Sequence, residues 1–296
     1  MAVINGNFDQ NLSENFASIR EYNYDHRFQN NVYYKEKGFT FEDVLTLNNY
    51  DGGYYDLNFG GNSIAYKRAS NGDPIISGGN FTGFKTSYWS GSSWVERFAA
   101  TGFKYSAKSF YQAVMSSTRA DDVKAMQTIL NGNDTFELSS QRDVVRAYSG
   151  NDKIFGRGGN DLLNGGLGND LIIGGGGKDK LVGGGGKDTL VGGGGVDKFI
   201  YRTVGDSRIG KNRRDVITDF KGSQGEKIRL SAIDAFTKTR GNQAFTYIGS
   251  KAFTGTKGEV RFSGGILQMN TGTDKAADME IALTGVTSFS QNFLIL

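Results

Sequence analysis

The chain of 296 residues contains no cysteine, one proline and one histidine. Without cysteine it can form neither disulfides nor thiolate metal sites. Histidine-dependent catalysis would have to use His26, and neither the HExxH motif of zinc proteases nor the GxSxG motif of serine hydrolases is present. Carboxylates are frequent, but no pair stands out by its spacing. We therefore predict no catalytic residue.

Long hydrophobic runs are also missing. No apolar run is long enough to cross a bilayer, and no amphipathic insertion segment is visible, so we expect no membrane insertion. The first ten residues, MAVINGNFDQ, lack the charged head and apolar core of a Sec signal peptide. Glycine, in contrast, is abundant at 44 residues, which together with the scarcity of proline predicts a β-rich protein.

Charge is close to balanced overall but unevenly distributed. The net charge is +3, and the segment from Tyr201 onward carries 14 basic residues against 9 acidic ones. We interpret this excess as a solvated face, with electrostatic binding to acidic glycans or an anionic cell surface as the alternative. We expect no nucleic-acid partner.

A nonapeptide repeat between Gly132 and Ile200 organises the chain. An apolar residue lies two positions after each repeated aspartate, and glycine lies two positions before all but one of them. The clean units read GGLGNDLII, GGGGKDKLV, GGGGKDTLV and GGGGVDKFI. The aspartates, nine residues apart, are Asp134, Asp143, Asp152, Asp161, Asp170, Asp179, Asp188 and Asp197. A disordered glycine-rich linker would lack this strict apolar period.

Each unit has a simple physical interpretation. Glycine permits a tight left-handed turn, and the apolar residue points inward from a strand too short to bury anything alone, so the units must stack. Two units close a coil of eighteen residues, which places aspartates eighteen apart above one another. Such a column of carboxylates repels itself unless a cation lies between its members. Turn carbonyls and carboxylates together form an oxygen cage that suits calcium.

The nonapeptide resembles the repeat GGxGxDxUx of the RTX, or hemolysin-type, calcium-binding proteins, most clearly from Gly150 to Ile200. The resemblance implies a parallel β-roll with several Ca²⁺ ions between its turns. It also implies a ligand pattern. One half of each calcium site would be an Asp and the main-chain carbonyls two and four residues before it. The other half would come from the unit eighteen residues later, as its Asp and the carbonyls three and five residues before that Asp.

This implied pattern pairs Asp152 with Asp170, Asp161 with Asp179, Asp170 with Asp188, and Asp179 with Asp197. The metal ligands that it implies are Tyr148, Gly150, Asp152, Arg157, Gly159, Asp161, Gly165, Gly166, Leu167, Gly168, Asp170, Gly174, Gly175, Gly176, Gly177, Asp179, Gly183, Gly185, Asp188, Gly192, Gly194 and Asp197.

Three positions depart from the repeat. The unit QRDVVRAYS around Asp143 has no turn glycine, so we expect a weak or empty site there. Lys178 and Lys187 precede their aspartates, where small or polar residues are common in the family. We expect their side chains to face solvent and to lower the calcium affinity without abolishing the sites.

The first 130 residues are less informative. Alternation and turns from Tyr54 to Phe103 predict a β-meander, and KSFYQAVMSS and RADDVKAMQTIL predict two short helices. The part from Gly72 to Asp134 loosely resembles a module that precedes the repeats in secreted RTX proteins, which implies a structural cap. Its many aromatic residues suit a small β-core, with stacking on sugar rings as the alternative.

After the repeats, Asp206 and Asp215 keep the nine-residue step, but the glycines are gone and Arg208 occupies the apolar position, so we expect the coil to fade. The segments from Asp215 to Leu296 resemble the C-terminal domain of serralysin-type secreted proteins, which implies a β cap and a type I export signal. Arg229 replaces the Asp usual in that family, and the loop 270–278 is poorer in acidic residues, so we expect no calcium there.

We predict a mainly β fold: an N-terminal β-rich domain with two short helices (1–130), an RTX calcium-binding parallel β-roll (131–200) and a serralysin-like C-terminal β cap with the secretion signal region (201–296). The expected protein is secreted, extracellular, calcium-binding and non-enzymatic, with an adhesive, matrix or surface-associated role. The alternative is a polysaccharide-active enzyme, a hydrolase or lyase, with its site in residues 1–130. Expected partners are the type I secretion apparatus and extracellular polysaccharide or a cell surface.

Overall fold

The structure is a computed structural model of the chain. It describes residues 3–6, 24–29, 34–36, 39–41, 43–49, 55–68, 74–89, 94–106, 127, 130–138, 140–236 and 241–296, with main chain only up to residue 106. The chain divides into two compact units, Met1–Leu138 and Ser139–Leu296. Both are built from β-strands, which confirms the predicted mainly β class. The division into three domains stays a prediction.

The first unit contains an antiparallel sheet in the order β2, β5, β6, β7, β8, β1, and β1 also pairs in parallel with β9. The bounds are β1 Val3–Gly6, β2 Tyr24–Gln29, β5 Asp43–Asn49, β6 Tyr55–Arg68, β7 Pro74–Trp89, β8 Trp94–Ser106 and β9 Thr135–Glu137, with a separate pair β3 Tyr34–Glu36 and β4 Phe39–Phe41. Strands β6, β7 and β8 form the predicted meander. The two predicted helices lie outside the described residues, apart from isolated positions.

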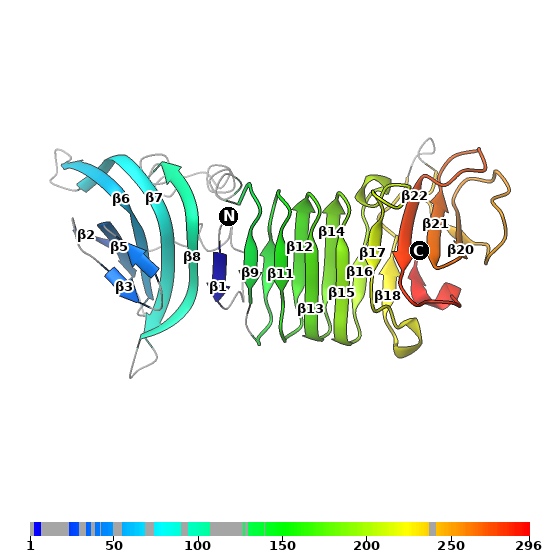
Figure 1. Cartoon of the computed structure of the whole chain (residues 1–296), viewed down its shortest axis with the longest axis horizontal. Helices are drawn as coiled ribbons and strands as arrows, with labels where there is room; N and C mark the ends of the chain where they lie inside the picture. The colour runs from blue at the N-terminus through cyan, green and yellow to red at the C-terminus, as the bar shows by residue number, and fades with distance from the viewer. Residues whose placement is uncertain are drawn as a thin grey trace. The chain divides into compact units, whose positions relative to one another are not determined.

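The second unit contains a coil of short strands that lie side by side in two parallel sheets (Figure 1). In one, the β13 sheet, the coil strands are β11 Lys153–Phe155, β13 Leu171–Gly177, β15 Thr189–Gly195, β17 Asp215–Ile217 and β22 Met279–Leu283. The other, the β14 sheet, contains β10 Val144–Arg146, β12 Leu162–Leu167, β14 Lys180–Gly185, β16 Lys198–Ile200, β18 Lys227–Arg229 and β23 Leu294–Ile295. Strands from β10 to β18 alternate between the sheets along the chain, as in the predicted parallel β-roll.

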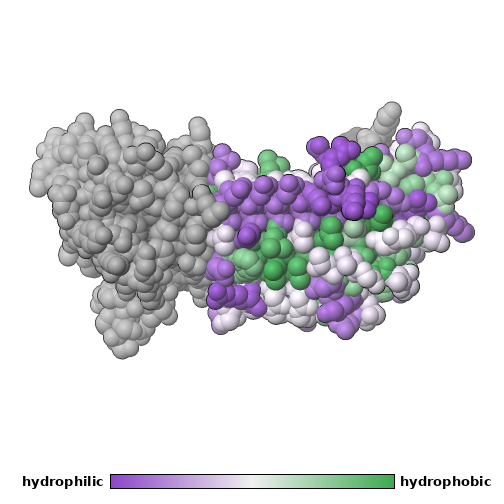
Figure 2. All heavy atoms as spheres, in the orientation of Figure 1, coloured by the Kyte–Doolittle hydropathy of each residue, from purple (hydrophilic) through white to green (hydrophobic). Residues whose placement is uncertain are grey.

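The register of the roll follows the eighteen-residue turn. Ile154 lies opposite Ile172 in the β13 sheet, and Leu163 lies opposite Leu181 in the β14 sheet. These apolar side chains, two residues after each aspartate, point between the sheets and are at most 4% exposed. Burying each contributes about 1.5–3 kcal/mol, so the row forms the hydrophobic core of the roll. The residues on either side of each core residue start from the outer face, where Val182 is nevertheless buried, and hydrophilic side chains gather in a band along the face in Figure 2.

The coil does not fade after Asp197, and that expectation was wrong. Strand β17 continues the β13 sheet with Val216 opposite Thr189, and β18 continues the β14 sheet with Lys227 opposite Lys198. Strands β22 and β23 then add one further parallel strand to each sheet. The nine-residue period is lost because residues 201–214, with the short 3-10 helix η1 (Val204–Asp206), leave the coil before the chain returns to it.

The end of the coil is closed by antiparallel strands and aromatic rings. Strands β21 (Ile266–Asn270) and β20 (Glu259–Ser263) extend the β13 sheet beyond β22, followed by β19 (Thr246–Tyr247). The ring of Phe220 lies 6.0 Å from that of Phe199, the last core residue of the repeats, and 6.0 Å from that of Phe289. In the described part of the chain, no helix is long and apolar enough to cross a membrane.

Candidate metal centre

The repeated aspartates form two buried columns, one at each edge of the roll. The Asp179 column consists of Asp143, Asp161, Asp179 and Asp197, and the Asp170 column of Asp152, Asp170 and Asp188. All are at most 3% exposed. Within each column, Oδ1 of one aspartate accepts a hydrogen bond of 2.8–2.9 Å from the main-chain N–H of the aspartate eighteen residues earlier. The predicted eighteen-residue pairing is therefore present in the hydrogen bonds.

The second carboxylate oxygen has no such partner. The buried Oδ2 atoms of Asp161, Asp170 and Asp179 accept no hydrogen bond, and those of Asp188 and Asp197 are in the same situation. A buried carboxylate oxygen without a donor costs free energy, and such groups are rare in folded proteins. A row of them, each fixed by its own Oδ1 bond, suits a cation that takes oxygen ligands.

The main chain surrounds these oxygens closely. A Cβ atom added to Gly165 would lie 2.1 Å from Oδ2 of Asp170, and one added to Gly183 would lie 2.2 Å from Oδ2 of Asp188. The carboxylate therefore points at the turn of its own unit, five residues before it. Only glycine leaves room for it there.

Carbonyl oxygens of one turn face the next turn of the stack. Gly175 has a φ of 100°, and a Cβ there would lie 2.3 Å from the carbonyl oxygen of Arg157, which is four residues before Asp161. The carbonyl of Leu167, three residues before Asp170, accepts a hydrogen bond of 2.8 Å from the N–H of Gly150. The implied ligand carbonyls thus lie in the turns between stacked units. Their role as calcium ligands remains a prediction.

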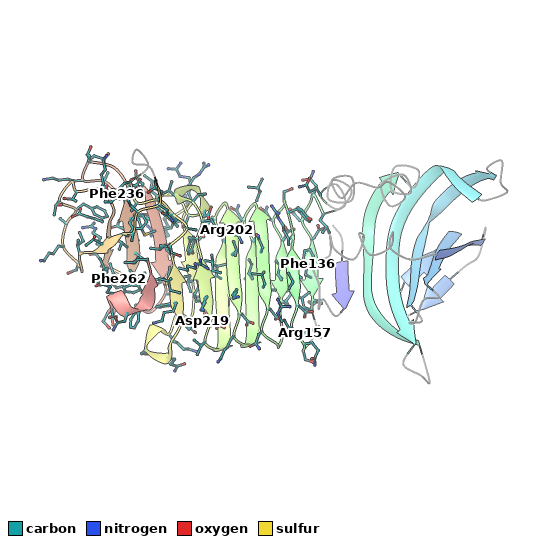
Figure 3. All side chains as sticks on the ribbon, turned by 180° about the vertical axis from the view of Figure 1, so that it is seen from behind. Phe136, Arg157, Arg202, Asp219, Phe236 and Phe262 are labelled. Carbon is teal, nitrogen blue, oxygen red and sulfur yellow. The ribbon has the colours of Figure 1, made fainter. Side chains whose placement is uncertain are left out.

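Two of the residues whose carbonyls are predicted to bind the metal are not glycines, yet their backbone is in a left-handed conformation. Tyr148 has a φ of 73° and Arg157 a φ of 66°, at the position that glycine takes in later units. Their carbonyls accept hydrogen bonds of 2.9 Å from the N–H groups of Leu167 and Gly176. A side chain in this region costs about 1–2 kcal/mol, so the stack imposes this backbone against local preference. Arg157 is exposed and lies at the same edge of the roll as Asp219 (Figure 3).

The unit around Asp143 joins the stack although it lacks turn glycines. Asp143 is fully buried, and the carbonyl oxygen of Gln141 would lie 2.3 Å from a Cβ on Gly159, so this turn packs on the next as the others do. The weak or empty site expected here remains a prediction. Of the two departing lysines, Lys178 is exposed and Lys187 is half-buried.

Two further residues belong to the columns. Asp215 keeps the nine-residue step, but we expected the coil to fade there, and we predicted no role for Glu226. Asp215 continues the Asp170 column, because its Oδ1 accepts a 2.9 Å hydrogen bond from the N–H of Asp188, 27 residues earlier. Glu226 continues the Asp179 column, because Lys227, the next residue, donates its N–H to the carbonyl of Asp197 and pairs with Lys198. Both side chains are fully buried, and Oδ2 of Asp215 and Oε1 of Glu226 accept no hydrogen bond.

A signal for these two residues does exist in the sequence. Each is followed two positions later by a buried isoleucine, Ile217 and Ile228, as in the repeats. The separation of 29 residues from Asp197 hid Glu226, and the loss of the turn glycines hid Asp215, which lies three nine-residue steps after Asp188. Asp206, which keeps the nine-residue step as Asp215 does, instead accepts hydrogen bonds of 2.6 Å from the N–H of Arg202 and the hydroxyl of Thr203.

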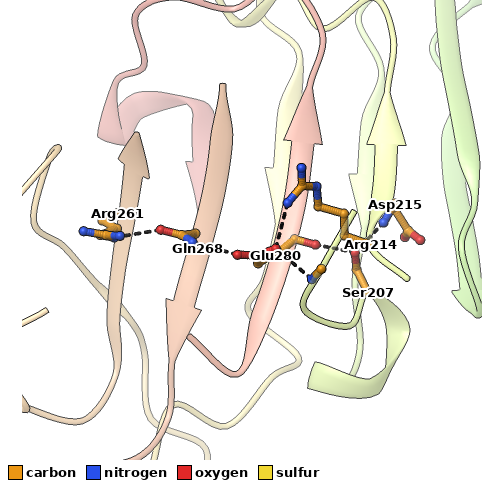
Figure 4. A network of polar contacts seen from close by, with 7 residues as sticks. Ser207, Arg214, Asp215, Arg261, Gln268 and Glu280 are labelled. Atoms are coloured by element: carbon orange, nitrogen blue, oxygen red, sulfur yellow. Dashed lines mark hydrogen bonds and ion pairs between the residues drawn. The ribbon is translucent and has the colours of Figure 1, made fainter. Parts of the chain in front are cut away.

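A polar network holds the point where the chain returns to the roll (Figure 4). The N–H of Asp215 donates to the hydroxyl of Ser207 at 2.8 Å, and that hydroxyl donates to the carbonyl of Glu280. Arg214 forms a 2.9 Å ion pair with Glu280, whose other oxygen accepts from Gln268 at 2.8 Å. These contacts hold residues 201–214, the excursion from the coil, against β22, so Asp215 enters the column in register.

Asp219 closes the last turn of the repeats. Its two carboxylate oxygens accept hydrogen bonds of 2.9 and 2.8 Å from the N–H groups of Gly192 and Gly193. Burial raises the pKa of Asp197 and of Glu226, and the nearby charge of Asp219 adds to both shifts.

Burial raises the pKa values of the column carboxyls. It brings the pKa of Asp161 and of Glu226 to about 7 and that of Asp170 and Asp179 to about 6, although a main-chain hydrogen bond opposes each shift. The pKa of Asp215 is raised further, by burial and by the nearby charge of Asp188. Without a cation the ionised carboxylates are therefore unfavourable, and a divalent ion at the free oxygens would reverse this preference.

The donor set fits calcium. Among the described residues, no three His, Cys, Asp or Glu side chains gather as a ligand cluster, so a bound metal would depend on main-chain oxygens as well as carboxylates. Calcium takes six to eight hard oxygen ligands, including main-chain carbonyls, in flexible geometry. Asp pairs, turn carbonyls and the absence of cysteine therefore agree with calcium.

Comparison with known proteins supports this assignment for the repeats. Residues 130–163, 138–172 and 164–199 match the family model described as RTX calcium-binding nonapeptide repeat (4 copies). Residues 130–199 thus carry RTX calcium-binding repeats, as the resemblance implied. No curated protein matches the chain.

Two solution structures are also similar. They are the AlgE6R3 and AlgE6R2 subunits of the mannuronan C5-epimerase from Azotobacter vinelandii, each 22% identical over 56% of this chain. The matches cover 78% and 92% of those chains, with TM-scores of 0.33 and 0.31.

Proposed function

We propose that the protein is a secreted, non-enzymatic calcium-binding protein whose roll folds when it meets calcium outside the cell. The observation that carries this proposal is the row of buried carboxylate oxygens that accept no hydrogen bond, one per turn along both edges of the roll. The RTX repeats supply the cation class.

Folding and calcium binding are coupled in this proposal for two reasons. Ordering the glycine-rich turns costs much conformational entropy, and stacked ionised carboxylates repel one another. Each ion that binds only the folded roll stabilises it by mass action, by about 2.7 kcal/mol when free calcium is a hundredfold above Kd. At low cytosolic calcium the repeats would stay unfolded, and at millimolar calcium they would fold.

Circular dichroism tests this coupling. The metal-free chain should show little strand signal, gain it with millimolar calcium and lose it with a chelator, while equal magnesium should have much less effect because Mg²⁺ demands near-ideal octahedral geometry. A spectrum that is unchanged by calcium contradicts the proposal.

Export through a type I apparatus is the second part of the proposal. It is supported by the resemblance of Asp215–Leu296 to the C-terminal domain of serralysin-type proteins, and RTX repeat proteins are typically extracellular. The chain should reach the medium when it is co-expressed with a type I exporter, and a chain without Ser223–Leu296 should stay in the cell.

A matched control separates export from folding. The Asp179→Ala chain should still be exported, because a type I apparatus passes the unfolded chain, although its roll is weakened. Secretion of the truncated chain would contradict the C-terminal assignment. Retention of Asp179→Ala would show that retention follows misfolding instead of loss of the signal.

The extracellular role that we propose is adhesive, matrix or surface-associated. The alternative remains a polysaccharide-active enzyme with its site in residues 1–130. The structure describes this region mainly as separate main-chain segments, so it gives no side-chain geometry for such a site. A glycan array and a reducing-sugar assay on the full chain distinguish the two roles: binding without turnover supports the first, and turnover supports the second.

A further inference from the structure

The outer face of the β14 sheet carries a row of lysines. Lys180 lies opposite Lys198, and Lys198 lies opposite Lys227, at matching positions of the neighbouring strands β14, β16 and β18. Each lysine directly follows a member of the Asp179 column and precedes an inward core residue, so all three side chains start from the outer face. We call these three residues the lysine ladder.

The ladder has a regular spacing and few partners. Neighbouring strands lie about 4.8 Å apart, so the three side chains start at intervals of about 4.8 Å along the roll. Lys180 and Lys198 are exposed, and within the described residues neither side chain forms a hydrogen bond or ion pair. The ammonium of Lys227 donates to the carbonyl of Asn292. Like charges directly opposite one another are destabilising, so the sheet itself gains nothing from this arrangement.

The rest of the face is basic or neutral. The outward positions of β10, β12, β14, β16 and β18 contain no Asp or Glu; they are Val144, Arg146, Leu162, Asn164, Lys180, Val182, Lys198, Ile200, Lys227 and Arg229. Val182 is buried, because the 3-10 helix η1, which ends at Asp206, packs against β14. Arg229 is exposed and extends the positive charge along β18.

The opposite sheet provides an internal contrast. In the β13 sheet the equivalent positions are Lys153, Leu171, Thr189 and Val216, so one lysine is followed by uncharged residues. The β-roll itself therefore does not require lysine at this position. The ladder is a property of one face.

We propose that the lysine ladder binds a linear acidic polysaccharide, with the sugar chain crossing the strands and its carboxylate or sulfate groups above successive lysines. A small anion would contact at most two lysines, whereas a polymer with regularly spaced charges can contact all three. A row one lysine wide suits a thread-like partner better than the plane of a bilayer. Outward aromatic residues, on which nucleobases would stack, are absent from these described strands.

The inference rests on the proposed function, because the calcium-loaded roll is the form in which the ladder exists and its charge is effective. Without a cation, Asp179, Asp197 and Glu226 lie one residue from the three lysines and offset their charge. Divalent ions in the column remove that offset, so binding should be measured at saturating calcium.

The test uses the calcium-loaded full chain and fluorescent oligosaccharides of hyaluronan and chondroitin sulfate, with neutral dextran as the reference. The double substitution Lys180→Gln and Lys198→Gln should weaken binding about tenfold near physiological salt. The control, Lys153→Gln with Lys251→Gln, removes two exposed lysines elsewhere and should change binding less than twofold. Added salt should weaken wild-type binding more steeply than binding of the double variant.

Each outcome has a definite meaning. Equal losses in both double variants would show a response to net charge alone and overturn the inference. Unchanged binding in the ladder variant would overturn it as well, and tighter binding of single-stranded DNA or of phosphatidylserine vesicles would assign the face to another partner. Circular dichroism of the same samples separates the two proposals: a folded roll that does not bind contradicts the ladder alone, and an unfolded chain contradicts calcium-coupled folding.

Discussion

The repeat turns from Asp152 to Asp197 and the coil that follows them reach the same arrangement by different routes. In the repeats, column members are eighteen residues apart and each turn is rich in glycine. Beyond them, Asp215 and Glu226 lie 27 and 29 residues after the preceding column members, Asp188 and Asp197, and neither follows a GGxG run. In both regions the acid is buried, one of its oxygens accepts a main-chain hydrogen bond, and the other accepts none.

Strand register, more than sequence period, therefore defines the columns. A nine-residue unit with glycine is the shortest way to return to the stack, because it requires left-handed turns such as that at Gly175. A longer excursion can return without them if other contacts hold it. Here Ser207, Arg214 and Glu280 provide those contacts.

The largest effect is expected inside the repeats. In the paired geometry Asp179 serves ions with both Asp161 and Asp197, and Asp170 likewise has two partners, whereas Asp143 lies at the start of its column. Asp170→Ala and Asp179→Ala should each remove up to two calcium ions and lower the calcium-dependent Tm more than Asp143→Ala does. Calorimetric calcium titration and thermal melts measure both quantities. Equal losses for the three variants would contradict the pairing.

The next largest effect is expected at the turn glycines. Gly175 and Gly176, which are neighbours in one glycine run, provide a variant and its matched control. Gly175→Ala places a Cβ 2.3 Å from a carbonyl oxygen at a φ of 100°, while a Cβ on Gly176 would be 3.8 Å from its nearest neighbour. Gly175→Ala should cost about 2 kcal/mol or more of unfolding free energy, and Gly176→Ala less than about 1 kcal/mol. Urea unfolding in calcium measures this difference. Similar costs would show that the turns are not stacked as described.

An acid pH should partly replace calcium in both regions. In the metal-free fold, burial raises the pKa of Asp161 and Glu226 to about 7 and that of Asp170 to about 6, above the values near 4 of the unfolded chain. The fold therefore binds protons more tightly, and its stability falls as the pH rises from about 4 to about 7.

Circular dichroism of the metal-free chain between pH 8 and pH 5 tests this sign. The strand signal should grow as the pH falls through 7, whereas calcium affinity should fall over the same range because protons compete for the carboxylates. A metal-free fold that becomes more ordered as the pH rises would contradict the account.

The smallest effect concerns the strained positions at the start of the roll. Arg157→Gly removes a side chain from a φ of 66° and should stabilise the calcium-loaded roll by about 0.5–1 kcal/mol, the net of relieved strain and greater freedom in the unfolded chain. The control Arg146→Gly in strand β10 should destabilise it. A loss of stability with Arg157→Gly would mean that its side chain makes a favourable contact that outweighs the strain.

Much of the roll could be predicted from the sequence because the nine-residue period encodes it directly. Glycines, buried aspartates and the inward row from Ile154 to Phe199 follow from that period, and so does the eighteen-residue pairing. The period says nothing once the chain makes an excursion. Asp206 and Asp215 both keep the nine-residue step, so that step did not distinguish the column member Asp215 from Asp206, and Glu226 was missed. Asp215 and Glu226 nevertheless both keep the local pattern of an acid followed two residues later by an isoleucine.

The lysine ladder was hidden for the same reason. Lys180 and Lys198 are eighteen residues apart, but Lys227 joins them only through the register of β18, so the sequence shows an excess of basic residues without an arrangement. The strand order of the N-terminal unit was not predictable either, because antiparallel pairing depends on long-range contacts that a residue pattern does not specify.

The most direct test of the account is the number of calcium ions bound by the wild type, Asp215→Asn and Asp206→Asn. If register defines the columns, Asp215→Asn should lose at least one ion, because it removes a charged ligand paired with Asp188. Asp206→Asn should keep the wild-type number, since both carboxylate oxygens of Asp206 already accept hydrogen bonds from Arg202 and Thr203, although its charge lies near enough to add to the effect of burial on the pKa of Asp188 and Asp215. The opposite result, with an ion lost in Asp206→Asn and none in Asp215→Asn, would show that the hydrogen-bonded register does not define the calcium sites beyond the repeats.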